Sequence, residues 1–173
     1  MRKVDRIERR SEAGFVLVES MSSLLFYLVM IGAIGAIILM LFSGSKLAST
    51  EQEVGTIRLQ VRQLYSATNE YSGLTTDLAK TAGAIPSSMI RGDGSVQNAL
   101  GGEVEIEPSD STTNFQITVK AVPKSEAVKL AMFQSGTWVD VLLNDTSIAE
   151  AENLLTAATE AVIDSNTITF VSN

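Results

Sequence analysis

A long uncharged segment near the N-terminus constrains this chain more than any other feature of its sequence. No Asp, Glu, Lys or Arg occurs from Ser20 to Ser45, and residues 24–42 are almost all apolar. At about 1.5 Å of rise per residue, a helix over this run crosses roughly 30 Å of hydrocarbon. The sequence therefore predicts a membrane-spanning helix. The remainder of the 173-residue chain is long enough for one domain with its own core.

Basic residues lie mainly on one side of the apolar run. Five of them, Arg2, Lys3, Arg6, Arg9 and Arg10, precede Gly14, and almost none follow the run closely. The positive-inside rule then predicts an N-terminus in the cytoplasm and an outward-facing domain. A cleaved secretory signal has a shorter apolar core followed by small residues at the cut site, so we expect this segment to be retained.

The outward part is acidic and lacks the residues of several chemistries. After Gly44 it carries eight basic and 16 acidic residues, a net charge of −8, which disfavours binding to nucleic acid. The chain has no Cys and no His, and neither a P-loop nor a G-x-S-x-G motif occurs. A Ser-Lys or carboxylate enzyme is compatible with this composition, but no spacing indicates one. We therefore expect a non-enzymatic protein without a cofactor or a metal ion.

Hydrophobic periodicity predicts an α+β fold. Apolar residues recur with helical spacing at Val54, Ile57, Val61, Leu64 and Tyr65, and no proline precedes Pro86. One long N-terminal helix from Phe15 to about Asn69 is therefore predicted, apolar all round in its first half and amphipathic in its second. Further helices are expected at residues 76–83, 126–134 and 149–162, and strands at residues 103–107, 114–122, 138–144 and 167–172. We expect an antiparallel β-sheet packed on the amphipathic half of the long helix.

Three short patterns suggest chemistry but also have plain structural interpretations. The tripeptide RGD at Arg91 to Asp93 precedes good turn residues, and NDTS at Asn144 to Ser147 fits a glycosylation sequon but is also turn sequence. Alternate glutamates at Glu103, Glu105 and Glu107 share one face of a strand and could gather a cation. We interpret the first two patterns as turns and the glutamates as a solvated face.

The stretch G-FVLVE, from Gly14 to Glu19, is followed by about twenty apolar positions and resembles the processing motif of type IV prepilins. In that family a membrane peptidase on the cytoplasmic side cuts after the glycine and methylates the new N-terminus, here Phe15. The stretches YSGLTTDLAKTAGAIPSSMI, NALGGEVEIEP, NFQITVKAVP and NTITF are similar to PilS-type type IVb major pilins of conjugative thin pili. The resemblance covers nearly the whole chain and implies the pilin fold.

The resemblance also implies roles for residues near the apolar run. A carboxylate near the membrane core costs about 2.5 to 3.5 kcal/mol on an insertion scale, so Glu19 is expected to have a partner. The family suggests the free α-amine of Phe15 in an adjacent subunit. The alternative is that Glu19 lies at the headgroup level and caps the helix. Small residues at Gly32, Ala33, Gly35 and Ala36 are expected to let identical helices pack closely in a filament.

Two departures from the family pattern stand out. Pilins of this kind usually close the C-terminal region with a disulfide, whereas the corresponding regions here read SEAVKLA and ATEAVID, so Ala127 and Ala161 are expected to fill that site. Many pilins also carry a proline in the first half of the long helix, at the position that is Ala36 here. Local melting of this helix would then depend on Gly32 and Gly35.

The implied protein is the major pilin of a type IVb pilus. Residues 1–14 would be a cytoplasmic leader peptide, residues 15–45 a transmembrane segment and filament core, and residues 46–173 an outward-facing globular pilin domain. The implied partners are copies of itself, a prepilin peptidase, an assembly ATPase and an inner-membrane platform, and the pilus would serve conjugative mating or attachment. The chain would lie in the inner membrane as a single-pass precursor and then in an extracellular pilus.

Two other interpretations remain open at this point. The chain could be a pseudopilin or minor pilin of a type II secretion-like system, because the N-terminal motif is shared with those proteins. It could also be a membrane-anchored binding domain that never polymerises.

Overall fold

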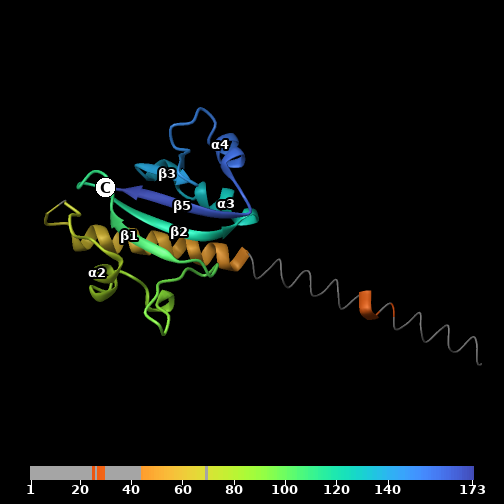
Figure 1. Cartoon of the computed structure of the whole chain (residues 1–173), viewed down its shortest axis with the longest axis horizontal. Helices are drawn as coiled ribbons and strands as arrows, with labels where there is room; N and C mark the ends of the chain where they lie inside the picture. The colour runs from red at the N-terminus through yellow and green to blue at the C-terminus, as the bar shows by residue number, and fades with distance from the viewer. Residues whose placement is uncertain (1–24, 26, 30–43, 69) are drawn as a thin grey trace, which may run out of the picture. The chain divides into compact units, whose positions relative to one another are not determined.

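The computed structural model describes residues 25, 27–29, 44–68 and 70–173 (Figure 1). The chain divides into two compact units, Met1–Gly44 and Ser45–Asn173. Within the described ranges, no helix is both long enough and apolar enough to cross a bilayer. Most of the predicted span over residues 24–42 lies outside these ranges, and its four described residues are helical with exposed side chains.

The second unit opens with a helix over residues 44–64, which packs one apolar stripe into the core. Val54, Ile57 and Val61 are fully buried, as their helical spacing predicts. Leu64, which was predicted to extend the stripe, is 46% exposed. The helix ends at this residue and the chain turns through residues 65–68, so the helix stops about five residues before its predicted end. Tyr65, the next predicted member of the stripe, is partly buried and packs against the core.

A compact loop region connects this helix to the sheet. It contains α2 (Thr76–Thr81) and the short 3₁₀ helix η1 (Ser87–Met89). Thr75 caps α2 by accepting a hydrogen bond from the Leu78 amide at 3.1 Å. Near its end this region lies so close to the sheet that a Cβ added at Gly102 would be 1.7 Å from the Lys120 carbonyl oxygen. Only glycine fits at this position.

The sheet has five antiparallel strands in the order β1-β2-β5-β3-β4 (Figure 1). The strands are β1 (Val104–Pro108), β2 (Phe115–Pro123), β3 (Asp140–Leu143), β4 (Thr146–Ser147) and β5 (Ser165–Ser172). The C-terminal strand β5 therefore lies in the middle, paired with β2 and β3. Four strands were predicted, whereas β4 was not, because two residues are too few to show an alternating pattern.

One face of the sheet forms the core. Phe115, Ile117 and Val119 of β2 and Ile168 and Phe170 of β5 are fully buried. These positions alternate along each strand, as expected for a sheet with one covered face. The helix over residues 44–64 lies along the β1 and β2 side of this layer (Figure 1). The prediction of an α+β fold with an antiparallel sheet packed on the amphipathic helix is confirmed.

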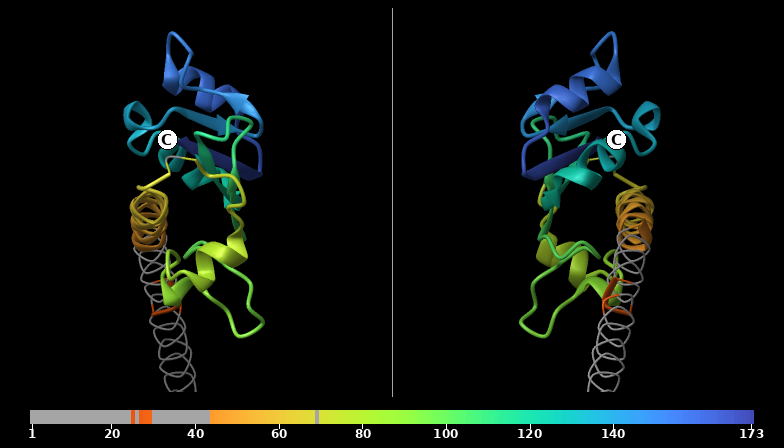
Figure 2. Two further views of the ribbon diagram at one scale, coloured as in Figure 1. Left: turned by 90° about the vertical axis from the view of Figure 1, so that its left-hand side faces the viewer. Right: turned by 90° about the vertical axis from the view of Figure 1, so that its right-hand side faces the viewer.

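The chain between β2 and β5 forms the other end of the domain. Helix α3 (Lys124–Ala131) contacts β2, β5 and β3, and it is followed by the 3₁₀ helix η2 (Ser135–Thr137). Helix α4 (Leu154–Ala161) contacts α3 and lies at one end of the domain, whose other end is formed by the loop region that contains α2 and η1 (Figure 2). It begins later than the predicted residue 149, because Asn153 caps it by accepting a hydrogen bond from the Thr156 amide at 3.1 Å.

Candidate functional site

The site residues predicted from the N-terminal motif lie outside the described part of the chain. They are Gly14, Phe15, Glu19, Gly32, Ala33, Gly35 and Ala36. Their roles therefore remain predictions. The surface features on the outer side of the helix over residues 44–64 were not predicted from the sequence.

Arg58 joins this helix to the end of the sheet. Its Nε donates a hydrogen bond to Ser172 Oγ at 2.9 Å, and its terminal nitrogens donate to the hydroxyl and the carbonyl of Thr137. The guanidinium carbon also lies 4.1 Å from the centroid of the Trp138 ring, within cation–π range. Burial and the nearby charge of Arg62 lower the pKa of Arg58, which nevertheless stays protonated. Arg58 is thus a structural link inside the domain.

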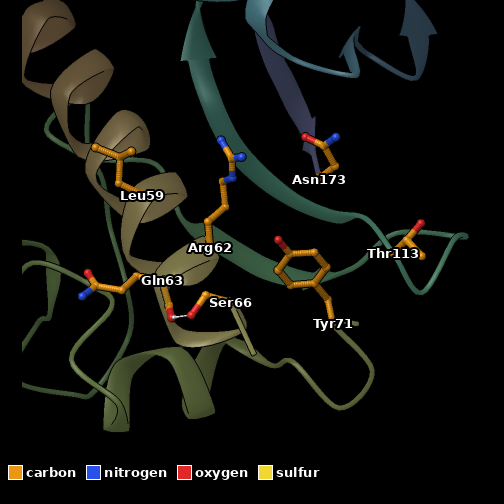
Figure 3. A pocket seen from close by; sticks show the side chains of 7 residues that line it. All are labelled: Leu59, Arg62, Gln63, Ser66, Tyr71, Thr113 and Asn173. Carbon is orange, nitrogen blue, oxygen red and sulfur yellow. Dashed lines mark hydrogen bonds between the residues drawn. The ribbon is translucent and has the colours of Figure 1, made fainter. Parts of the chain in front are cut away.

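Arg62 lies one helical turn further on and borders a hollow of about 560 Å³ (Figure 3). The hollow is lined by Leu59, Arg62, Gln63, Ser66, Tyr71, Thr113 and Asn173. The Arg62 guanidinium and the Tyr71 hydroxyl point toward the space beside the end of β5 (Figure 3). Burial raises the pKa of Tyr71, and the nearby Arg62 opposes this rise. Tyr71 is therefore a hydrogen-bond donor at neutral pH, and together with Arg62 it offers groups that suit a carboxylate.

A second hollow of about 480 Å³ lies between the same helix and the loop after α3. Leu59 and Arg62 line both hollows, and Gln134 lines the second one from the loop. The Leu59 side chain is 67% exposed. An exposed leucine flanked by two hollows and one arginine is a feature that association with another surface would bury.

The end of the domain around α4 is acidic. No Lys or Arg occurs from Leu130 onward, whereas six acidic residues do. Around α4, Glu152 and Glu160 are exposed, and so are the apolar side chains of Leu155 and Ile163, at 57% and 56%. The acidic residues are visible in the sequence, but no sequence pattern indicated the exposed apolar residues beside them.

Two asparagines tie down the chain on both sides of α4. Asn144 Nδ2 donates to the Ala161 carbonyl and to Asn166 Oδ1, both at 2.9 Å. Asn166 in turn donates to the carbonyls of Val122 and Ile163 at 3.1 and 2.8 Å, and accepts from the Ile163 amide at 2.8 Å. Ala127 is fully buried in α3, and Ala161 packs against the core from α4. The region that the resemblance associates with a disulfide is thus held by alanine packing and by this amide network.

The RGD and NDTS patterns lie in turns. The Asp93 carboxylate accepts hydrogen bonds from the Ser95 amide and hydroxyl at 2.9 and 2.7 Å, which lower the pKa of Asp93. Asn144 and Asp145 have φ values of 50° and 65° and form the two-residue connection between β3 and β4. Both positive φ values fit the type I′ hairpin turn that asparagine favours.

The glutamates of β1 form a solvated face. Lys120 Nζ lies 2.6 Å from Glu105 Oε1 and 3.4 Å from Glu103 Oε2, and Gln116 Nε2 donates to Glu107 Oε1 at 2.8 Å. The hydrogen bond to Glu105 is the main cause of a raised Lys120 pKa. In the portion of the chain that the structure describes, no three potential metal ligands of the His, Cys, Asp or Glu type come together.

Comparison with known proteins identifies the fold and the family. The family model described as PilS N terminal matches residues 45–173. The structure is similar to a type IVb pilin from Salmonella typhi, with a TM-score of 0.57 and 21% identity, over 75% of this chain and 99% of that one. It is also similar to TcpA, a type IV pilin from the Vibrio cholerae El Tor biotype, with a TM-score of 0.59 and 12% identity, over 75% of this chain and 99% of that one.

No curated protein sequence matches the chain. The family match nevertheless spans the whole globular unit, and the helix over residues 44–64, the antiparallel sheet and the central C-terminal strand match the type IV pilin fold. This chain belongs to the PilS family of type IV pilins, structural subunits that polymerise with copies of themselves into pili.

Proposed function

We propose that this protein is the major pilin of a type IVb pilus. One observation carries the proposal: a globular unit that matches the PilS family follows an apolar run headed by G-FVLVE. In this proposal the precursor is cut between Gly14 and Phe15, and Phe15 becomes the methylated N-terminus. The resemblance to conjugative thin pili supports mating or attachment between bacteria as the use of the pilus.

The proposal assigns a stage of assembly to each part of the chain. Residues 1–14 are the cytoplasmic leader, residues 15–45 are the membrane anchor and later the filament core, and residues 46–173 are the outward globular domain. The uncharged stretch from Ser20 to Ser45 supports the anchor. A prepilin peptidase, an assembly ATPase and an inner-membrane platform are the proposed partners, and the inner membrane holds the precursor before it enters the extracellular pilus.

Glu19 is proposed to set the register of the filament. In an apolar filament core, its carboxylate pairs with the α-amine of Phe15 in an adjacent subunit. Removing one partner of a buried ion pair is strongly destabilising, by about 3 to 5 kcal/mol, because the other charge is left uncompensated. Gly32, Ala33, Gly35 and Ala36 allow the helices to approach closely enough to form this core.

Replacing Glu19 by Ala tests this role in cells that carry the assembly machinery. We expect Glu19→Ala to be cleaved after Gly14 as in the wild type but to yield at least about tenfold less pilin in sheared surface material. Glu8→Ala is the matched control, because this acidic residue leaves with the leader and its loss should not change the yield. Normal pili from Glu19→Ala would contradict the register role.

A further inference from the structure

We propose that the Asp93–Gly94 peptide bond is a site at which this chain converts spontaneously to isoaspartate, and that contacts from Lys80 and Ser95 hold the conversion back in the folded protein. The site lies in the RGD stretch, for which the proposed function gives no role. The conversion does not depend on assembly into a pilus. The sequence of the turn, its hydrogen bonds and the chemistry of an aspartate that precedes glycine each support the site.

Asp93 and Gly94 form the one place in the sequence where an aspartate or asparagine precedes a glycine. Because glycine has no Cβ, its backbone is unhindered and rotates more freely than that of other residues. Its nitrogen can therefore approach the side-chain carbon of the preceding aspartate and close a five-membered ring. This pair is the position in the chain most prone to such ring closure.

The conversion proceeds in two steps whose atoms balance. In the first, the Gly94 nitrogen attacks Cγ of a protonated Asp93 carboxyl group, a C–N bond forms, and the N–H proton leaves with the carboxyl hydroxyl as water. In the second, water opens the succinimide ring at the main-chain carbonyl carbon of Asp93, which breaks the original peptide bond and frees an α-carboxylate. Only water leaves and enters, so no oxidant or reductant is needed. The product has an extra carbon atom in its main chain, which changes the shape of the RGD stretch.

The pair lies at the tip of a short hairpin between η1 and β1. The Arg91 amide donates a hydrogen bond to the Ser95 carbonyl, and the Gly94 amide donates one to the Arg91 carbonyl, both at 2.9 Å. Gly94 has a φ of 85°. This pattern fits the three-residue loop in which a type I turn is followed by a left-handed glycine. The aspartate of such a turn has a ψ of about 0°, and ring closure requires a large rotation from this value, which breaks the bond between Gly94 and Arg91.

Ser95 holds the carboxylate of the turn in its unreactive form. Its amide and its hydroxyl donate to Asp93 Oδ1 at 2.9 and 2.7 Å. These hydrogen bonds, the one from the amide first, lower the pKa of Asp93. The protonated acid, which is the form that closes the ring, is therefore scarce at neutral pH.

Lys80 holds the turn from outside. Its Nζ donates to the Gly94 carbonyl at 3.0 Å and lies 2.8 Å from Asp77 Oδ1, so it ties the tip of the hairpin to α2. A rotation at the aspartate also moves the following glycine, and it therefore strains this bond. The folded turn thus opposes ring closure at the attacking nitrogen, at the carboxylate and at the glycine carbonyl.

Ageing the purified full-length protein in detergent tests the site. Folded samples and samples unfolded in guanidinium chloride would be kept at the same neutral pH and temperature, digested with trypsin, and analysed by mass spectrometry with fragmentation that distinguishes aspartate from isoaspartate. Cleavage after Arg91 and Lys120 gives a peptide that also contains Asp110 as an internal reference, followed by serine. We expect isoaspartate to form faster at Asp93 than at Asp110 in the unfolded chain, and at least about tenfold more slowly at Asp93 in the folded protein than in the unfolded one.

Two variants test the restraint by the fold. Ser95→Ala removes the hydroxyl, and Lys80→Met removes the ammonium group but keeps the length of the side chain. Each should raise the rate at Asp93 in the folded protein at least about threefold, whereas in guanidinium chloride both should match the wild type. Ser88→Ala and Lys129→Met are the matched controls, because these exposed residues belong to η1 and α3, and they should leave the rate unchanged.

Three outcomes would overturn the proposal. Isoaspartate that forms no faster at Asp93 than at Asp110 in the unfolded chain would show that the pair is not a preferred site. Equal rates at Asp93 in folded and unfolded wild type would show that the turn restrains nothing. Folded Ser95→Ala and Lys80→Met that age like their controls would show that these two side chains are not the restraint.

Discussion

At the scale of single residues, Asn144 and Asn166 have the clearest structural effect. Their amides hold the ends of β2, β3 and α4 together in a chain that has no cysteine. Leaving one buried polar group of such a network without its hydrogen bond costs about 1 to 3 kcal/mol. The network therefore contributes stability at the place where the resemblance associates other pilins with a disulfide.

Replacing Asn166 by Ala should remove about 3 kcal/mol from the free energy of unfolding, because the buried Val122 carbonyl and the partly buried amide and carbonyl of Ile163 lose their partner. Thermal or urea unfolding of the purified full-length pilin in detergent measures the loss. Asn153→Ala is the matched control, since removing this helix cap should cost only about 1 kcal/mol. A loss for Asn166→Ala no larger than that of the control would contradict the role of the network.

This network could not be predicted from the sequence. Asn166 bonds to Val122, which lies 44 residues earlier, and no local pattern indicates which distant backbone group an asparagine reaches. The sequence predicted only that Asn144 lies in a turn, which is correct. The resemblance indicated only that alanines take the place of the cystine found in other pilins. The side chain of Asn144 has a second role that depends on the fold.

At the scale of elements, periodicity predicted most of the fold because the core is one-sided. The burial of Val54, Ile57 and Val61 follows from helical spacing, and that of Ile117 and Val119 follows from strand alternation. The errors lie at the ends of elements. Local caps and turns decide where the helix over residues 44–64 stops and where α4 starts, and hydrophobic spacing does not report them.

The contact between the helix over residues 44–64 and β5 depends strongly on Arg58. We expect Arg58→Ala to lower the free energy of unfolding by about 2 kcal/mol, because it removes the cation–π contact with Trp138 and the hydrogen bonds to Thr137 and Ser172. Arg62→Ala, one turn further on, should change it by less than about 0.5 kcal/mol. Equal losses for the two variants, measured by urea unfolding, would show that Arg58 is not a structural link.

At the scale of the whole molecule, the sequence predicted a pilin but not the surfaces of its globular domain. The family is visible in continuous stretches such as G-FVLVE and NFQITVKAV. In contrast, Arg62, Tyr71 and Thr113 line one hollow although they lie on three separate segments. Which exposed leucine borders a hollow becomes visible only once the sheet has placed the helices.

Two parts of the chain act at different times in the proposed assembly. The acidic globular unit forms the described surface, while the uncharged stretch before it is proposed to leave the membrane and enter the filament core. The register role of Glu19 requires that the processed chain be a filament subunit. The identity of the first residue in assembled material is therefore central.

The most direct measurement is the intact mass and N-terminal sequence of this protein in material sheared from the cell surface. The account predicts a chain that begins with N-methylated Phe15 and lacks the 14 residues of the leader. A chain that still begins at Met1 and stays with the membrane fraction would contradict it.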